Sequence, residues 1–300
     1  MSPRAFKAMG TDWWLDADRP DLLAGAEDLV RAHEARLSRF VPTSSLSALN
    51  RHRVATCPTL AAVARLGLRM REATGGAFDP TLGARLVALG YDRTFAAIAT
   101  PAPAPDGPTA SALTVTVVGD EVRLDGPGAL DLGGIAKGYT VDRTLAWLLS
   151  GGAQAAFVDG GGDLRGAGAD CAYGVGDGLA VEARHGAVAT SSTSARRWRD
   201  AVGRPLHHLL DPRTGHPTVG PLETATVIAP DAATADALAT AVLAAPTTAL
   251  RTLTAFGAHA LVRDQGGAWW ITPGAPLDAA SDSPRHIHSH SHSHLAEARS

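Results

Sequence analysis

The sequence predicts an α+β fold, because its expected helices and strands do not alternate in the regular strand–helix–strand order of a doubly wound sheet. The chain has 300 residues, of which 45% are hydrophobic. It can therefore bury a large core in one domain or in two closely packed lobes. No repeat of fixed period is visible along the chain. These observations favour one irregular α+β unit over a parallel α/β sheet.

In the first half of the chain, the spacing of apolar residues predicts two helices. The first covers 21–38 and is capped by Asp21, and the second covers 59–73 and is capped by Thr59. An Ala/Pro-rich stretch at 96–112 is expected to form a mobile surface loop. The elements expected next are a hairpin of 113–118 with 121–124, a helix from about 134 to 149 and a strand over 154–158.

The second half is expected to be richer in strands. Strands are predicted near 179–183, 186–190, 205–210 and 223–229, helices over 232–245 and 247–256, and a closing hairpin of 259–262 with 268–271. The tail carries alternating histidines at 286, 288, 290, 292 and 294. Such a tract can chelate Ni²⁺, Zn²⁺ or Cu²⁺, although a disordered tail with incidental affinity is the simpler interpretation. We expect one domain over 1–280 and a disordered His-rich tail over 281–300.

The composition excludes several classes of protein. The net charge is −3 and no long basic run occurs, so we expect no nucleic-acid partner. The apolar runs are far shorter than the roughly 20 residues of a membrane-spanning helix, so we expect no stable membrane insertion. The N-terminus lacks the apolar core of a secretory signal, and Cys57 and Cys171 are too few for a disulfide framework or a zinc site. We therefore expect a cytoplasmic protein.

Two short stretches contain residues suited to phosphate chemistry. Asp131–Tyr139 reads D-L-G-G-I-A-K-G-Y, which predicts a strand end, a glycine turn and a helix with Lys137 near its start. Backbone N–H groups and a cation at such a turn can hold a phosphate. His207–Pro217 places His208 at a strand end, where an imidazole of ordinary pKa can accept a proton at neutral pH. Asp211 follows, and it either orients His208 or caps the Pro-Arg-Thr-Gly turn.

A structural interpretation stays open for each of these residues. A single histidine on a strand is more often part of the packing, and a lysine such as Lys137 can extend from a helix into solvent. Gly133, Gly134 and Gly138 are expected to allow close packing rather than to contact a ligand themselves.

Asp236 and Thr240 lie four residues apart in the Ala-rich helix and therefore share one of its faces. A carboxylate and a hydroxyl are hard oxygen ligands, suited to Mg²⁺ together with waters and a ligand phosphate. The alternative is a first-turn acid and a threonine that bonds back to its own helix. The glycine run at Asp159–Gly166 fits either a close backbone approach or a ligand loop. The hydroxyl-rich segment 190–194 is expected to face a ligand.

Taken in order along the chain, these motifs resemble those of the ApbE family, the FAD:protein FMN transferases. The resemblance covers residues 6–272. The matching segments are M-G-T at 9–11, L-S-R-F at 37–40, the stretch from Ser45 to Asn50, F-D-P-T at 78–81, D-L-G-G-I-A-K-G-Y at 131–139, the glycine loop at 159–163, A-T-S at 189–191, H-L-L-D-P-R-T-G at 208–215 and A-D-A-L-A-T at 235–240.

The resemblance implies a single α+β unit with a central mixed sheet flanked by helices and with FAD in a cleft. It implies Mg²⁺-dependent transfer of FMN from FAD to a threonine or serine hydroxyl of an acceptor protein, with AMP leaving. The metal would be held by Asp236, Thr240 and the carbonyl of Ala136, His208 would be the base, and Lys137 would neutralise phosphate charge. The residues implied in flavin binding are Met9, Gly10, Thr11, Asp79, Thr81, Gly133, Gly134, Lys137, Asp142, Asp163, Thr190, Ser191, His208 and Asp211.

The chain departs from the family pattern in two places. Ser192 stands where the family often has glycine after A-T-S, so the geometry of this loop is expected to differ. Many members are exported lipoproteins, whereas this chain lacks the signal and the lipid-attachment cysteine, so its acceptor is expected in the cytoplasm or facing it. Two other functions stay open: an FAD pyrophosphatase that gives free FMN and AMP, and a non-catalytic FAD-binding protein.

Overall fold

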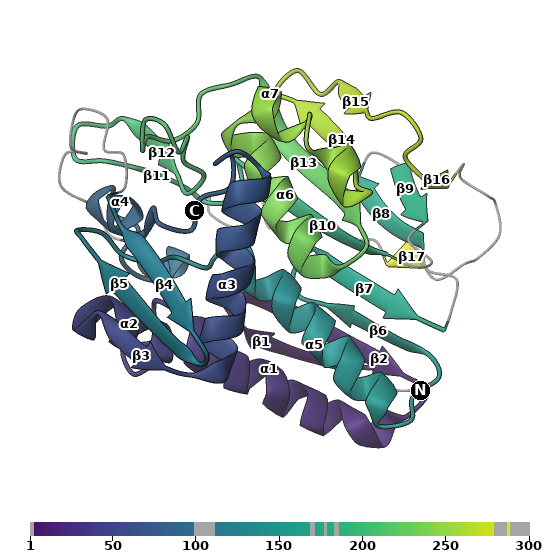
Figure 1. Cartoon of the computed structure of the whole chain (residues 1–300). Coiled ribbons are helices and arrows are strands. Elements are labelled where there is room, and N and C mark those ends of the chain that lie inside the picture. Colours follow the sequence, from purple (N-terminus) through teal and green to yellow (C-terminus); the bar gives the residue numbers. More distant parts are fainter. Residues whose placement is uncertain are drawn as a thin grey trace, which may run out of the picture.

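An eight-stranded sheet forms the central layer of the computed structural model (Figure 1). The structure describes residues 3–98, 112–168, 172–176, 179–182, 186–278 and 287–288. In spatial order the strands are β1 (Arg4–Ala8), β2 (Thr11–Ala17), β6 (Ala156–Asp159), β7 (Asp163–Ala167), β10 (Ala187–Ser192), β13 (Leu222–Ala229), β14 (His259–Asp264) and β15 (Trp269–Ile271).

The α+β class and the central sheet flanked by helices are confirmed, but the strand directions differ from the expected mixed sheet. Each pair of neighbours in the central sheet is antiparallel. Consecutive strands such as β1 and β2, or β6 and β7, are joined by short turns, which allow only antiparallel pairing.

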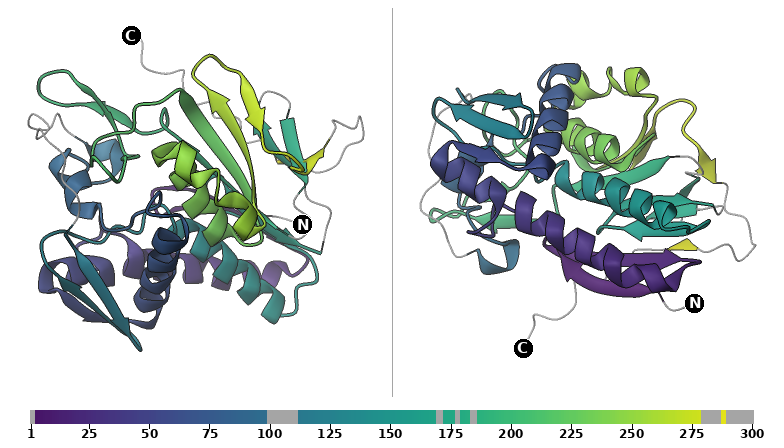
Figure 2. Two further views of the ribbon diagram at one scale, coloured as in Figure 1. Left: turned by 45° about the horizontal axis from the view of Figure 1, so that its top comes forward. Right: turned by 60° about the horizontal axis from the view of Figure 1, so that its bottom comes forward.

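Helices cover one face of this sheet (Figure 2). They are α1 (Leu23–Leu37), α5 (Ala136–Ser150) and α6 (Ala232–Ala244), with α3 (Pro58–Ala73) beside α6. Every residue of α6 except Thr240 is buried. The alanine-rich sequence explains this, because small side chains let the helix pack closely against β10, β13 and α5. Asp236 is thereby carried into the interior, while Thr240 keeps a partly open position.

A smaller sheet covers the opposite face. It consists of β16 (Leu277–Asp278), β9 (Leu179–Glu182), β8 (Ala172–Gly176) and β17 (Ile287–His288). Tyr173 and Val181 from this sheet are fully buried against Phe157, Val188 and Leu261 of the central sheet. The central sheet is therefore buried on both faces where these layers overlap.

A three-stranded sheet and several short elements complete the fold. The sheet has the order β3 (Val54–Thr56), β5 (Glu121–Asp125), β4 (Thr114–Val118). A separate two-stranded ribbon is formed by β11 (Arg197–Arg199) and β12 (Pro205–His207). The short helices are η1 (Pro20–Leu22), α2 (Ser45–His52), α4 (Gly83–Ala88), η2 (Phe95–Ala97), α7 (Pro246–Ala249) and η3 (Leu253–Phe256).

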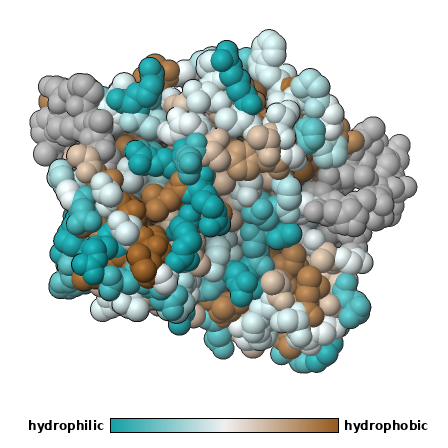
Figure 3. Space-filling model, viewed as in Figure 1, coloured by the Kyte–Doolittle hydropathy of each residue, from teal (hydrophilic) through white to brown (hydrophobic). Residues whose placement is uncertain are grey.

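The face seen in Figure 3 is mixed, with apolar atoms gathered over β4 and over the end of α5. Val118, at the end of β4, is 70% exposed, and Trp147 and Leu149 on α5 are partly exposed. Isolated exposed apolar side chains are normal on soluble domains. None of these three residues belongs to a motif that the sequence singled out.

Two expected helices differ from their predicted form. The first begins at Leu23 rather than 21, because Pro20 starts the separate turn η1 and Asp21 pairs with Arg19 instead of capping the helix. The helix expected over 247–256 is broken into α7 and η3. At the break, the Thr252 hydroxyl donates a hydrogen bond to the carbonyl of Ala249 at 2.8 Å, which competes with a continuous helix.

Other predictions fall at the ends of elements or outside the described residues. The D-L-G-G turn is not preceded by a strand: only a single parallel bridge joins Ala129 to Leu82. Residues 99–111 of the expected mobile loop lie outside the described residues. So do 279–286 and 289–300 of the His-rich tail, whereas Ile287 and His288 pair with β8.

Candidate active site

Three charged side chains meet where α5, β7 and α6 converge. Lys137 is the second residue of α5, Asp163 begins β7, and Asp236 lies one turn into α6. The Lys137 ammonium forms an ion pair with Asp163, and its Nζ is 3.7 Å from Oδ2 of Asp236. The backbone N–H of Gly138 also donates to Oδ2 of Asp236, at 3.2 Å. We refer to Lys137, Asp163 and Asp236 as the lysine–dicarboxylate cluster.

Burial controls the charge state of this cluster. The side chains of Asp163 and Asp236 are only 1% and 4% exposed. Burial first, and then the neighbouring Asp236, raises the pKa of Asp163 well above its usual range, and Lys137 offsets this only in part. Burial alone would lower the pKa of Lys137, but the two carboxylates outweigh it and raise that pKa. Two buried acids thus share one cation, an arrangement that favours a further positive charge.

The neighbouring oxygen atoms fit a hard divalent cation. A Cβ on Gly134 would lie 2.8 Å from Oγ1 of Thr240, so glycine is what leaves this hydroxyl open toward the D-L-G-G turn. The carbonyl of Ala136 accepts a hydrogen bond from the Thr140 hydroxyl at 2.8 Å. Among the described residues, no group of three or more His, Cys, Asp or Glu side chains could hold a metal. An ion beside Asp236 would therefore need hydroxyl, carbonyl, water or substrate oxygens, which Mg²⁺ accepts.

His208 directly follows β12, as the sequence predicts for a strand end. Its Nδ1 is buried and makes no hydrogen bond within the described part of the chain. The ring of Tyr91 meets the imidazole edge-on, with 6.3 Å between ring centroids. Burial lowers the pKa of His208 well below its usual value, and Arg196, His207 and Lys137 lower it further. The expectation of an ordinary pKa is thus corrected: His208 is neutral near pH 7 but less basic than an exposed histidine.

Asp211 caps the turn that follows His208. Its Oδ1 accepts a hydrogen bond from the backbone N–H of Arg213 at 2.9 Å, and its Oδ2 lies 3.0 Å from the Arg213 guanidinium. Of the two alternatives that the sequence left open for Asp211, the structure supports the cap. Its predicted flavin contact stays a prediction.

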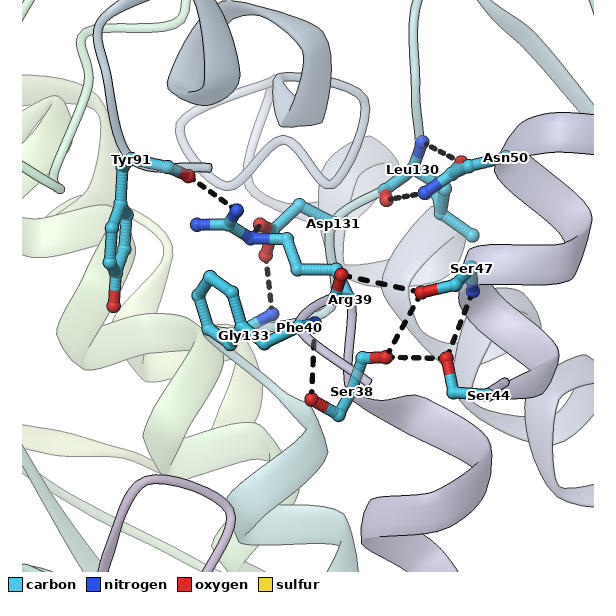
Figure 4. A network of polar contacts seen from close by, with 10 residues as sticks. All are labelled: Ser38, Arg39, Phe40, Ser44, Ser47, Asn50, Tyr91, Leu130, Asp131 and Gly133. Atoms are coloured by element: carbon cyan, nitrogen blue, oxygen red, sulfur yellow. Dashed lines mark hydrogen bonds and ion pairs between the residues drawn. The ribbon is translucent and has the colours of Figure 1, made fainter. Parts of the chain in front are cut away.

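Arg39 connects the D-L-G-G turn to the aromatic ring beside His208 (Figure 4). Its guanidinium pairs with Asp131, donates to the carbonyl of Tyr91, and lies 4.1 and 4.4 Å from the ring centroids of Phe40 and Tyr91. Asp131 in turn accepts the backbone N–H of Gly133 at 2.6 Å. The Arg39 and Asp131 side chains are only 10% and 12% exposed, so little water screens the pair.

The M-G-T motif is the tight turn of the β1–β2 hairpin. Met9 and Gly10 have φ of 52° and 74°, the left-handed region that a two-residue hairpin turn requires. Thr11 lies over the glycine loop between β6 and β7, because a Cβ on Gly161 would be 1.9 Å from Oγ1 of Thr11. Asp159 fixes that loop by accepting two of its backbone N–H groups, at 2.8 and 3.0 Å. These two motifs, distant in sequence, are therefore in contact.

The F-D-P-T motif supports the D-L-G-G turn. Oδ1 of Asp79 accepts the N–H and the hydroxyl of Thr81, at 2.9 and 2.7 Å. The carbonyl of Pro80 accepts the backbone N–H of Asp131 at 2.8 Å. Asp79 and Thr81 thus bond to each other, and a flavin contact by either one stays a prediction.

The remaining predicted binding residues also have partners within the protein. Asp142 accepts the first two N–H groups of α6, at 2.9 and 3.0 Å, and pairs with Arg165. The Thr190 hydroxyl bonds to that of Thr226 at 3.0 Å, and Ser191 is the next residue of β10. Asp142 fixes the start of the helix that carries Asp236. Flavin contacts by Asp142, Thr190 and Ser191 stay predictions.

Three residues of this region had no predicted role: Arg39, Tyr91 and Arg196. Arg39 and Tyr91 are 52 positions apart and contact each other, and Arg39 also pairs with the distant Asp131. Arg39 lies in the L-S-R-F motif, but the motif does not reveal these contacts, because only the folded chain brings the partners together. Arg196 follows the hydroxyl-rich segment 190–194, which was expected to face a ligand, and this is the one signal that points toward it.

Comparison with known proteins identifies the family. Residues 9–262 match the sequence model of the ApbE family, and the chain belongs to this family. It is 32% identical over 250 residues to the FAD:protein FMN transferase of Treponema pallidum (strain Nichols), covering 71% of this chain and 68% of that protein. A protein of the same name from Salmonella typhimurium is 30% identical over 261 residues, covering 77% of this chain and 74% of its own.

Solved structures agree with the fold. The crystal structure of the ApbE protein of Thermotoga maritima superposes with a TM-score of 0.78 at 26% identity, covering 91% of this chain and 97% of that one. The flavin transferase ApbE of Vibrio cholerae superposes with a TM-score of 0.75 at 24% identity and the same coverage. At this identity the match supports the fold alone.

Proposed function

We propose that this protein transfers FMN from FAD to a threonine or serine hydroxyl of an acceptor protein and releases AMP. The observation that carries the proposal is the buried lysine–dicarboxylate cluster, which lies at the N-terminus of α5, where Asp163 and Asp236 share one lysine. The names of the relatives, FAD:protein FMN transferase, support the same reaction.

The proposed step is a substitution at phosphorus. The acceptor oxygen forms a bond to the phosphorus on the FMN side of the FAD pyrophosphate, and the phosphoanhydride bond to AMP breaks. The hydroxyl proton moves to the neutral imidazole of His208, and AMP keeps the bridging oxygen. Lys137 and the backbone N–H groups at the start of α5 offset the negative charge that gathers on the leaving phosphate.

The site also fits Mg²⁺, with Asp236 and Thr240 as its protein ligands and the carbonyl of Ala136 as a third. When bound, the ion would neutralise pyrophosphate charge as a Lewis acid. Asp163 and Lys137 would then keep the Asp236 carboxylate oriented. This role agrees with their contacts and with the surplus of negative charge in the cluster.

The test is to incubate the purified protein with FAD, with and without Mg²⁺, and with a flavoprotein domain from the same cell as acceptor. We expect covalently bound, fluorescent FMN on the acceptor and one AMP for each FMN transferred. Asp236→Ala and His208→Ala should abolish labelling while the protein stays folded by circular dichroism. Labelling that persists in both variants would contradict the proposed roles.

The same assay separates the alternative, an FAD pyrophosphatase. In that case water replaces the acceptor hydroxyl, and free FMN and AMP form at the same rate with or without an acceptor. If FAD bound but stayed uncleaved with Mg²⁺ present, the protein would catalyse neither the transfer nor the hydrolysis.

A further inference from the structure

The ribbon of β11 and β12 has an inner and an outer face. Its pairs are Arg197 with His207, Trp198 with Leu206, and Arg199 with Pro205. The middle pair is buried and packs in an apolar cluster with Tyr91, whereas Arg197 and Arg199 are exposed. Since side chains alternate across a strand, every second residue points inward.

Continuing this register by one pair places Arg196 opposite His208, on the inner face with Trp198 and Leu206. Paired residues of an antiparallel ribbon lie on the same face and within reach of each other. If the alternation of β11 is extended by this one residue, the half-buried Arg196 side chain is on the face of the ribbon that adjoins the candidate active site, while Arg197 and Arg199 are exposed.

An inward-facing arginine is normally paired with an acid. Arg196 is only partly exposed, yet it has no ion-pair partner among the residues that the structure describes. Two acids near it in the sequence are engaged elsewhere: Asp200 pairs with Arg204, and Asp211 with Arg213. Arg196 lowers the pKa of His208 and, more weakly, that of Lys137. Lys137 is compensated by Asp163 and Asp236, so the positive charge without a described acid is that of Arg196.

We propose that Arg196 binds the pyrophosphate of FAD, donating from its guanidinium to phosphate oxygens. A guanidinium presents a planar fork of donors that matches two phosphate oxygens at once. A bound phosphate supplies the anion that the protein itself does not place beside Arg196. The inference rests on the proposed function, because it takes a nucleotide pyrophosphate as the ligand of this site.

The test compares Arg196→Ala, Arg196→Lys and Arg199→Ala in the full chain. Arg199 is the matched control, since it lies on the same ribbon, has the same charge and is exposed. FAD affinity is measured by titration without acceptor and with Mg²⁺, and inorganic pyrophosphate is used as a competitor. We expect Arg196→Ala to weaken FAD and pyrophosphate binding by roughly 10- to 100-fold, the usual effect of losing a charge-assisted pair. Arg196→Lys should keep part of the affinity, and Arg199→Ala should bind as the wild type does.

Equal FAD affinity in Arg196→Ala and Arg199→Ala would overturn the inference. So would a variant that binds FAD normally but has a raised KM for the acceptor protein, because Arg196 would then contact the acceptor. If the wild-type protein bound FAD but labelled no acceptor, the proposed transferase function would be wrong. The FAD affinities of the variants would still show whether Arg196 binds the pyrophosphate. A wild type that binds neither FAD nor pyrophosphate would defeat both.

Discussion

At the scale of single residues, two groups of charges in the candidate site are not balanced by their own neighbours. Lys137 stands between two nearly inaccessible carboxylates, and the half-buried Arg196 has no acid among the described residues. Incomplete compensation of the two buried carboxylates is expected to cost stability. A ligand that brings a divalent cation to the two carboxylates and phosphate groups to Arg196 would balance both sets of charges.

His33 on α1 gives a pH prediction at the same scale. It is 6% exposed, and burial, followed by repulsion from Arg36 and Arg143, lowers its pKa to about 4. The unfolded chain, with a histidine pKa near 6.5, then binds more protons between these two values. The contribution of neutral His33 is therefore complete above pH 6.5 and is lost as the pH falls toward 4.

We expect the loss of stability to be roughly 2–3 kcal/mol at most over that range. His33→Gln should flatten the dependence, since glutamine does not titrate and its amide can still reach the Thr140 hydroxyl, now 3.2 Å from Nδ1. The measurement is urea unfolding at several pH values. His52→Gln, on the exposed face of α2, is the control and should leave the slope unchanged. Identical slopes in all three proteins would show that the pKa of His33 is the same in the folded and the unfolded chain.

At the scale of elements, the contact between α5 and α6 determines the geometry of the site, because these helices carry Lys137 and Asp236. A Cβ on Gly138 would lie 2.2 Å from the carbonyl oxygen of Ala232, a backbone atom that cannot move without moving α6. Glycine at this position is what allows the helices to approach. The Gly138 N–H lies in the first turn of α5, where it has no intrahelical acceptor, and it donates to Asp236.

We therefore expect Gly138→Ala to cost about 3 kcal/mol of stability or more, at the upper end for overpacked cores. Gly25→Ala is the matched control: its Cβ would be 2.6 Å from the end of the Trp147 ring, a side chain that is 36% exposed and can turn away. Denaturant unfolding measures both. Similar costs for the two variants would mean that α6 shifts freely, and the site would not depend on this contact.

Elements with a strong local signal could be predicted from the sequence. The hairpin of β4 and β5, the Ala-rich α6 and the glycine turn before α5 form close to the predicted bounds. The hairpin of β1 and β2 was not predicted, because its turn has Met9 at positive φ, where glycine or asparagine is usual. At the α7–η3 break a threonine hydroxyl bonds to the backbone, a local contact that periodicity does not reveal.

At the scale of the whole molecule, the site residues that could be predicted are those with short-range motifs, such as Lys137, His208 and Asp236. The residues that could not be predicted, Arg39 and Tyr91, act through partners that only the tertiary fold supplies. The lowered pKa of His208 could not be predicted either, because it is caused mainly by burial, and burial depends on the tertiary fold. Motifs thus indicate the candidate residues, and packing shifts their pKa values.

The residues beyond Asp278 are expected to contribute little to the stability of the fold. The family match ends at residue 262, and the central sheet is complete with β15 at Ile271. Beyond Asp278, only Ile287 and His288 pair with the rest of the described structure, at the edge of the four-stranded sheet. A chain that ends at Asp278 should therefore keep its core. We expect its melting temperature to fall by less than about 4 °C, the shift that roughly 1 kcal/mol produces in a domain of this size.

The FAD affinity and Mg²⁺ response of the shortened chain should equal those of the full chain, whereas its affinity for Ni²⁺ should be lost with the alternating histidines. A full-length variant with serine at 286, 288, 290, 292 and 294 is the control for metal binding alone. If the shortened chain lost FMN transfer while the serine variant kept it, the backbone pairing of β17 with β8 would be part of the active molecule. If both lost it, the histidines would belong to the metal chemistry, and the domain would have to be extended to the end of the chain.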